Sequence, residues 1–232
     1  KQKTAYEIGV RLVGSEMCIR DRYRITTVDA VHRLFYAGKS RDAAKKALNR
    51  MVDADDLASV PIGKRTFYQI HGTAPLTSQP LWERFAVLTF CVMREPAQKR
   101  LTPQEFTELF PEFENAPGIS PAHQHYFLPL AGSPRLGRAL VDSDAEADRV
   151  ARKCRETLRD ASNTPGLVQL LDARLFVIAV LFAEQAKADT VAAILREQKL
   201  GAVFQFHVIP ELNDLLGLLP KTHGTHPQQD PA

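Results

Sequence analysis

The sequence has few cysteines and no long apolar run, and each shortage excludes a class of protein. Three isolated cysteines in 232 residues provide neither a disulfide framework nor the ligand spacing of a zinc site. The longest apolar run, Leu175–Ala183, has the length of a strand and falls well short of the roughly 18 residues of a membrane span. A Gly-rich phosphate-binding loop and a Ser/His/Asp signature are also missing. We therefore expect a cytoplasmic protein with reduced thiols, no membrane association and no cofactor.

Residues 1–22 resemble a translated DNA-sequencing adapter rather than a natural protein segment. Lys1–Ile8 and Leu12–Arg22 correspond to what two common adapter sequences encode. A signal peptide would need an apolar run of about 7–15 residues, but a glycine and an arginine interrupt the stretch Ile8–Val13. We expect residues 1–22 to have no structural role, and the natural N-terminus before Tyr23 to be missing.

The charge of the chain falls when this segment is set aside. The formal net charge of the whole sequence is +3, whereas residues 23–232 carry only +1. A general attraction to polyanions therefore cannot be argued from composition. The remaining charge is unevenly distributed, because residues 23–72 carry +4 and residues 73–232 carry −3.

Residues 23–72 predict two helices followed by a hairpin. Thr26-Thr27 and Ser40 stand where helix N-caps are expected, and Gly63-Lys64 stands at the hairpin turn. The expected elements are helix Val28–Ala37, helix Arg41–Val52, strand Leu57–Ile62 and strand Arg65–Ile70. This order is typical of a winged helix-turn-helix, whose first helix we expect to be truncated.

The second of these helices indicates a DNA-recognition helix. Its small and apolar residues share one face, namely Ala43, Ala44, Ala47, Leu48 and Met51. The opposite face offers donors that suit phosphates and base edges, and the hairpin tip adds two more. The candidate DNA-binding residues are Arg41, Lys45, Lys46, Asn49, Lys64 and Arg65. The alternative is a winged helix that binds protein, because any solvated helix face contains lysine and arginine.

The rest of the chain predicts a connecting region and an α/β domain. Residues 73–122 contain a linker, Thr73–Pro80, and two helices, Leu81–Arg94 and Pro103–Phe110, the second capped by Thr102. Residues 123–219 alternate strands and helices, which favours a partly parallel sheet. The expected strands are His125–Leu130, Arg135–Val141, Leu175–Ala183 and Val203–Ile209, and the expected helices cover residues 145–159, 166–171, 188–198 and 212–216. Residues 220–232 have the composition of a disordered tail.

Two stretches of the sequence resemble the replication-relaxation family, whose members occur on plasmids and integrated elements. The first is Thr26–Val31 with Arg50–Val52 and Tyr68–Ile70, and the second is Arg138–Asp144 leading into Arg149–Lys153. The resemblance implies a winged helix followed by a small α/β domain related to the PD-(D/E)XK nucleases. It also implies a role in replication or transcription control on a mobile element, with double-stranded DNA as the partner.

The sequence departs from the pattern of an active nuclease. That chemistry needs carboxylates on adjacent strands to hold a divalent metal, and a lysine near the attacked phosphate. Asp142 and Asp144 could supply carboxylates, but no lysine follows them at the required spacing, and Lys153 lies on the next helix. We expect a domain without catalytic or metal-binding residues that supports dimerisation or binds a protein partner. A metal-dependent endonuclease with a migrated active site is the alternative.

Other candidates for chemistry are incomplete. His123 and His125 are spaced like strand residues on one face, but the sequence places no third metal ligand beside them. Cys154 stands between Lys153 and Arg155, whose charges are expected to lower the pKa of its thiol. No general base is apparent, so a nucleophilic role is not predicted.

Overall fold

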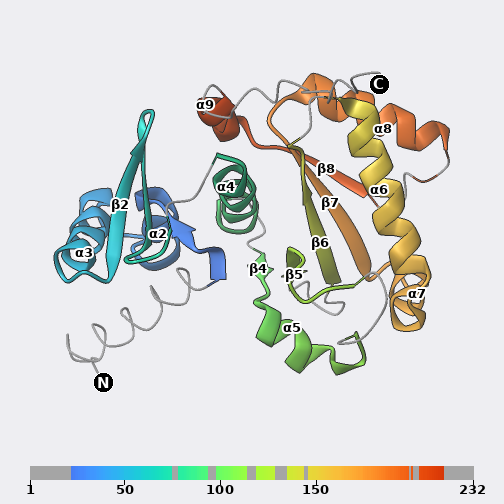
Figure 1. The fold of residues 1–232 in the computed structure, drawn as a ribbon, viewed down its shortest axis with the longest axis horizontal. Coiled ribbons are helices and arrows are strands. Elements are labelled where there is room, and N and C mark those ends of the chain that lie inside the picture. Colours follow the sequence, from blue (N-terminus) through green and yellow to red (C-terminus); the bar gives the residue numbers. More distant parts are fainter. Residues whose placement is uncertain are drawn as a thin grey trace, which may run out of the picture.

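The computed structural model describes residues 22–74, 78–93, 98–113, 119–128, 135–143, 146–198, 200 and 204–216 (Figure 1). The expectations for residues 1–21 and for the C-terminal tail lie outside these residues. The fold is mixed α/β: helices with a small antiparallel sheet come first, followed by a five-stranded mixed sheet with helices. None of the described helices is long and apolar enough to cross a membrane.

The N-terminal part contains two helices and a three-stranded antiparallel sheet of order β1-β3-β2. Thr27 caps the first helix, because its Oγ1 accepts a hydrogen bond from the backbone N–H of Ala30. Gly63 occupies the hairpin turn with φ +58°, a conformation that favours glycine. The elements are β1 (Ile25–Thr26), α2 (Val28–Phe35), α3 (Arg41–Asp53), β2 (Leu57–Ile62) and β3 (Arg65–Ile70). Both hairpin strands have the predicted bounds, whereas the sequence did not predict β1.

Helix α3 packs against α2 and the hairpin through its small residues. Ala44 and Leu48 are buried in a cluster with Val31, Leu57 and Tyr68. Alanine at this position lets two helices approach closely, and burial of Leu48 stabilises the pair by roughly 1.5–3 kcal/mol. Two details differ from expectation: Ser40 makes no side-chain capping bond, and Met51 is only half-buried.

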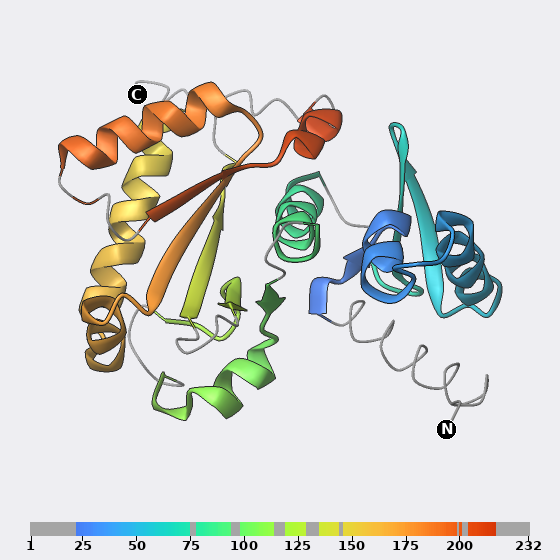
Figure 2. The same cartoon turned by 180° about the vertical axis from the view of Figure 1, so that it is seen from behind.

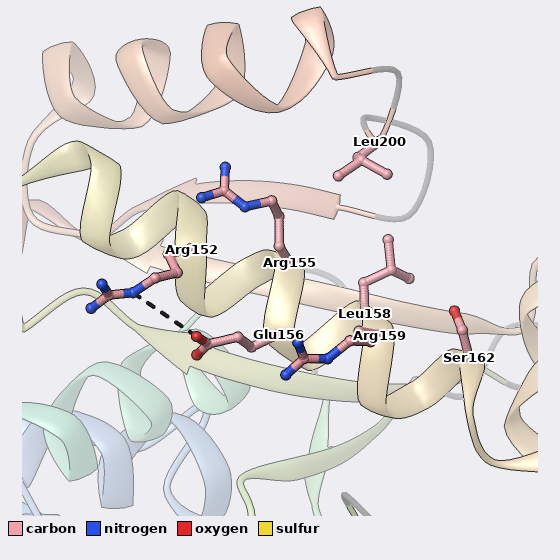
Figure 3. Close-up of a pocket in the computed structure, with 7 residues that line it drawn as sticks. All are labelled: Arg152, Arg155, Glu156, Leu158, Arg159, Ser162 and Leu200. Carbon is pink, nitrogen blue, oxygen red and sulfur yellow. Dashed lines mark ion pairs between the residues drawn. The ribbon is translucent and has the colours of Figure 1, made fainter.

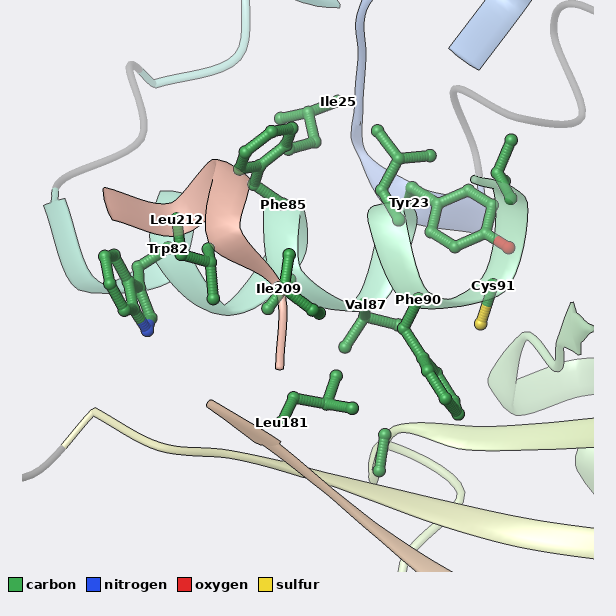
Figure 4. Packing of buried hydrophobic residues seen from close by; sticks show 14 of the residues in the cluster. Tyr23, Ile25, Trp82, Phe85, Val87, Phe90, Cys91, Leu181, Ile209 and Leu212 are labelled. Atoms are coloured by element: carbon green, nitrogen blue, oxygen red, sulfur yellow. The ribbon is translucent and has the colours of Figure 1, made fainter. Parts of the chain in front are cut away.

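Helix α4 (Ser78–Val92) lies between the two sheets and packs against both (Figure 4). On one side its Phe85 meets the ring of Phe67 edge-on, with ring centroids 5.2 Å apart. On the other side α4 shares a core cluster with Ala139 and Leu181 of the larger sheet. Because α4 packs against two sheets, apolar residues occupy most of its circumference and not a single face. The predicted linker ends earlier than expected, since Ser78–Pro80 already belongs to the helix.

The larger sheet has the strand order β4-β5-β6-β7-β8. The pairs β4–β5 and β5–β6 are antiparallel, and the pairs β6–β7 and β7–β8 are parallel. The prediction of a partly parallel sheet is confirmed. Every residue of β7 is buried, as expected for a strand covered on both faces. The strands are β4 (Lys99–Arg100), β5 (His125–Leu128), β6 (Arg135–Val141), β7 (Phe176–Phe182) and β8 (Phe204–Val208).

Helices cover both faces of this sheet (Figures 1 and 2). Helix α4 packs on one face, and α6 and α8 pack on the other in a second core cluster. Thr102 forms a capping box with Glu105 at the start of α5. The remaining helices are α5 (Pro103–Leu109), α6 (Ala147–Ser162), α7 (Pro165–Asp172), α8 (Gln185–Glu197) and α9 (Asn213–Leu216), with 3-10 turns at Pro111–Phe113 and Pro210–Leu212.

Candidate nucleic-acid interface

A hollow of about 320 Å³ lies where α2, α3 and the β2–β3 hairpin meet. Its lining includes four of the six candidate DNA-binding residues: Arg41, Lys45, Lys64 and Arg65. Two of these come from the helix and two from the hairpin, so the fold brings together cations that are about 20 positions apart in sequence. The other two candidates, Lys46 and Asn49, are exposed on α3 outside the hollow.

The exposure of α3 follows its sequence pattern. Arg41, Lys45, Lys46 and Asn49 are all exposed, while Ala44, Ala47 and Leu48 are buried. A helix of this kind presents its polar side chains to solvent along one side and packs the other side on the domain core.

Two of the arginines in the hollow are paired with carboxylates. Arg41 Nε donates to Asp29 Oδ1 over 2.5 Å, and this hydrogen bond raises the pKa of the guanidinium. Arg65 donates to Asp214 of α9, and its guanidinium also lies 5.4 Å from the ring centroid of Phe85. These carboxylates offset part of the positive charge that the sequence predicted for this surface.

The three lysines of the candidate set differ from the arginines. Within the described part of the chain, Lys45, Lys46 and Lys64 take part in no ion pair. Lys64 is exposed in the turn of the hairpin, whose tip projects beyond α2 and α3 (Figure 1). An external anion can therefore approach these ammonium groups without displacing a carboxylate.

The second candidate region is the end of β6, where Asp142 is buried. Both of its carboxylate oxygens lie 2.8 Å from Lys187 Nζ on α8, and its backbone carbonyl accepts a hydrogen bond from the Trp82 indole over 2.9 Å. Asp144, the proposed companion carboxylate, lies outside the described residues. No group of three or more His, Cys, Asp or Glu side chains among the described residues could hold a metal ion.

The two histidines near β5 have different surroundings. His125 is buried and stacks on Phe106 with ring centroids 4.1 Å apart. Burial lowers the pKa of His125 to about 3, so its ring is neutral at physiological pH. His123 precedes the strand, and its Nδ1 accepts a hydrogen bond from the backbone N–H of Ser120 over 3.2 Å. The rings are 5.9 Å apart and tilted.

The expectation for Cys154 is wrong. Burial raises the pKa of its thiol to about 12, and the opposing effect of Arg155 is smaller. The sequence suggested a lowered pKa because it showed only the charged neighbours along the chain. The structure places the sulfur in the apolar cluster beneath α6, where a thiolate is poorly solvated.

A hollow of about 500 Å³ lies along α6 and was not predicted (Figure 3). Arg152, Arg155 and Arg159 line it at helical spacing, a signal that the sequence does contain. Arg152 faces Glu156 at 3.9 Å, and Arg155 donates to the side chain of Gln198 over 3.1 Å. The surface is open and two of its arginines have partners within the fold, so it has the character of a solvated helix face.

Comparison with known proteins adds no assignment. No protein-family profile matches this chain, and no curated protein sequence matches it.

Proposed function

We propose that this protein binds duplex DNA through an N-terminal winged helix-turn-helix. In this proposal α3 is the recognition helix in the major groove, and the β2–β3 hairpin is the wing that meets the phosphate backbone. The observation that best supports this proposal is that one hollow between α3 and the hairpin is lined by four cations, namely Arg41, Lys45, Lys64 and Arg65.

The order of the N-terminal elements supports this proposal. A short strand, β1, precedes α2, and α3 follows a tight turn. Strands β2 and β3 then pair with each other, and β3 also pairs with β1. A winged helix uses its three-stranded sheet to hold the wing beside the recognition helix. The charge of +4 on residues 23–72 has the sign that phosphate contacts require.

We further propose that the α/β domain supports DNA binding without catalysis. The buried ion pair of Asp142 with Lys187 favours a structural role for this aspartate. Together with the resemblance to the replication-relaxation family, this leads to a role in replication or transcription control on a plasmid or other mobile element. Dimerisation or a protein partner would be the contribution of the second domain.

The main alternative is a winged helix that binds protein. The specific observation in its favour is that Arg41 and Arg65 already face Asp29 and Asp214. A surface of mixed charge suits an interface with another protein as well as one with DNA.

Salt-dependent binding to a fluorescent duplex separates these two functions. The variants are Lys45→Ala/Lys46→Ala and Lys64→Ala, with Arg174→Ala/Arg196→Ala as a matched control on exposed arginines remote from the hollow. Each lost phosphate contact should lower the salt slope of log K by about one unit. If both sets of lysine variants bind as tightly as the wild type with the same slope, the protein-binding alternative is correct.

A further inference from the structure

Tyr68 of β3 lines the same hollow as the candidate DNA-binding residues, but its side chain is buried. Only 3% of its surface is exposed, because the ring packs in the cluster with Val31 and Leu48 between α2, α3 and the hairpin. Among the described residues, no group makes a hydrogen bond with its hydroxyl. A hydroxyl at the end of a buried side chain is costly to leave without a partner, so this one is suited to a ligand in the hollow.

The hydroxyl of Tyr68 lies near Arg41, the first residue of α3. Burial raises the pKa of this hydroxyl, and the charge of Arg41 opposes the effect of burial. A hydroxyl with a raised pKa keeps its proton at physiological pH and can donate it in a hydrogen bond. Tyr68 therefore offers the hollow an uncharged donor beside the cations of its rim.

The hollow also borders the N-terminus of α2, an eight-residue helix. The N–H groups of a first helical turn have no acceptor within the helix. Thr27 Oγ1 accepts from the N–H of Ala30, whereas the N–H of Val28 makes no hydrogen bond within the described part of the chain. This end of the helix carries a partial positive charge, so it favours an anion at the wall formed by Thr27 and Val28.

Both carboxylates that line the hollow already have partners. Asp29 accepts a hydrogen bond from Arg41 over 2.5 Å, and Asp214 accepts one from Arg65 over 2.8 Å. Lys45, one turn after Arg41, takes part in no ion pair with the described residues. The donors that remain for a ligand therefore come from three elements: the first turn of α2, the first turns of α3, and β3.

We propose that this hollow seats one phosphate of the DNA backbone, with the Tyr68 hydroxyl donating to a phosphate oxygen and the Lys45 ammonium pairing with its charge. A backbone phosphate donates no hydrogen bond and accepts several, which suits a site built from O–H, N–H and ammonium donors. The inference rests on the proposed function. It adds a contact that the sequence pattern did not indicate, because Tyr68 stands there as a residue of a buried strand.

The test measures binding of the full chain to a fluorescent duplex by anisotropy at two salt concentrations. Tyr68→Phe keeps the buried ring and removes only the hydroxyl, so affinity should fall about tenfold or more while the salt slope of log K stays the same. Lys45→Gln should lower the affinity and also lower the slope by about one unit. Tyr126→Phe changes a buried tyrosine of β5 outside the hollow, and this matched control should bind like the wild type.

Duplexes in which single phosphates are replaced by neutral methylphosphonates locate the contact. At one position the replacement should weaken binding of the wild type but have little further effect on Tyr68→Phe or Lys45→Gln, since both side chains act on the same phosphate. Losses that add at every position overturn the inference, and so does wild-type affinity in Tyr68→Phe, while duplex binding itself still stands. Lys45 is exposed, so its variant should fold even if Tyr68→Phe does not. Failure of the wild type to bind any duplex overturns both the inference and the proposed function.

Discussion

Arg65 and Asp214 are 149 positions apart in the sequence and form an ion pair in the fold. Nη2 and Nε of Arg65 lie 2.8 and 3.1 Å from the same carboxylate oxygen, Asp214 Oδ2. The pair joins the β2–β3 hairpin to α9, at the C-terminal end of the described chain. If Arg65 contacts a DNA phosphate, that phosphate competes directly with the carboxylate of Asp214.

Asp214→Asn should therefore increase duplex affinity and raise the salt slope by about one unit, because Arg65 becomes available to a phosphate. The pair is partly exposed, so its loss should cost less than about 1 kcal/mol of stability. Fluorescence anisotropy at two salt concentrations measures the effect, with the exposed Asp172→Asn on α7 as the control. Equal gains in both variants would mean that net charge, not Arg65, controls binding.

Arg22 has a structural role that the sequence did not predict. Its guanidinium makes two hydrogen bonds to the carboxylate of Glu105 and a third to the carbonyl of Arg100. The expectation that residues 1–22 have no structural role is therefore wrong for Arg22. Arg22→Ala should destabilise the protein by about 1–2 kcal/mol, since Lys99 still pairs with Glu105.

Deletion of residues 1–21 provides the contrasting variant. This deletion retains Arg22 and should leave the melting temperature unchanged within error, as expected for an adapter-derived segment. Differential scanning calorimetry measures both variants. A loss of several degrees on deletion would show that residues before Arg22 contribute to folding.

The stability of the protein should fall in acid partly through Glu105. Burial alone would raise the pKa of Glu105, but hydrogen bonds from Arg22 and Lys99 outweigh it and lower the pKa to about 2. A carboxyl with a lowered pKa in the folded state stabilises the fold above its unfolded value near 4.5, and this contribution disappears as pH falls toward 2. Urea denaturation of Glu105→Gln and the wild type should therefore differ most at neutral pH. A difference that stays constant from pH 7 to pH 3 would contradict this assignment.

The ion pair of Asp142 with Lys187 predicts a stability effect on the larger sheet. Lys187→Met removes the 2.8 Å contact and leaves a buried carboxylate with less compensation. It should cost roughly 1–3 kcal/mol in denaturant unfolding. Lys187→Met combined with Asp142→Leu should recover part of this loss, because no uncompensated charge then remains. If the stability losses of the single variants Lys187→Met and Asp142→Leu simply add in the double variant, the two side chains are not directly coupled.

The α/β domain should be inactive as a nuclease. Supercoiled plasmid incubated with the protein and Mg²⁺ or Mn²⁺ should remain intact on a gel, because the carboxylate of Asp142 is ion-paired with Lys187. Cleavage that Asp142→Ala abolishes would establish the endonuclease alternative instead.

Local sequence signals predicted many of the elements of this fold. The hairpin strands Leu57–Ile62 and Arg65–Ile70 were found because Gly63 marks the turn and the strand pattern stands on both sides of it. The cap at Thr102 is also predictable from local sequence, since a cap residue and its partner, here Glu105, lie three positions apart. The exposed face of α3 also follows from a helical period within one segment.

Only the tertiary structure determined the contacts between distant segments. The two-residue strands β1 and β4 have no sequence pattern of their own and form because β3 and β5 offer them a free edge. Burial of the Cys154 thiol depends on the sheet beneath α6, which outweighs the charges beside it in sequence. The pairing of Arg65 with Asp214 depends on the tertiary packing that places α9 beside the β2–β3 hairpin. Sequence periodicity specifies which side of an element is apolar, but the packing of the whole chain decides which charges meet, because that choice is made by segments far apart along the sequence.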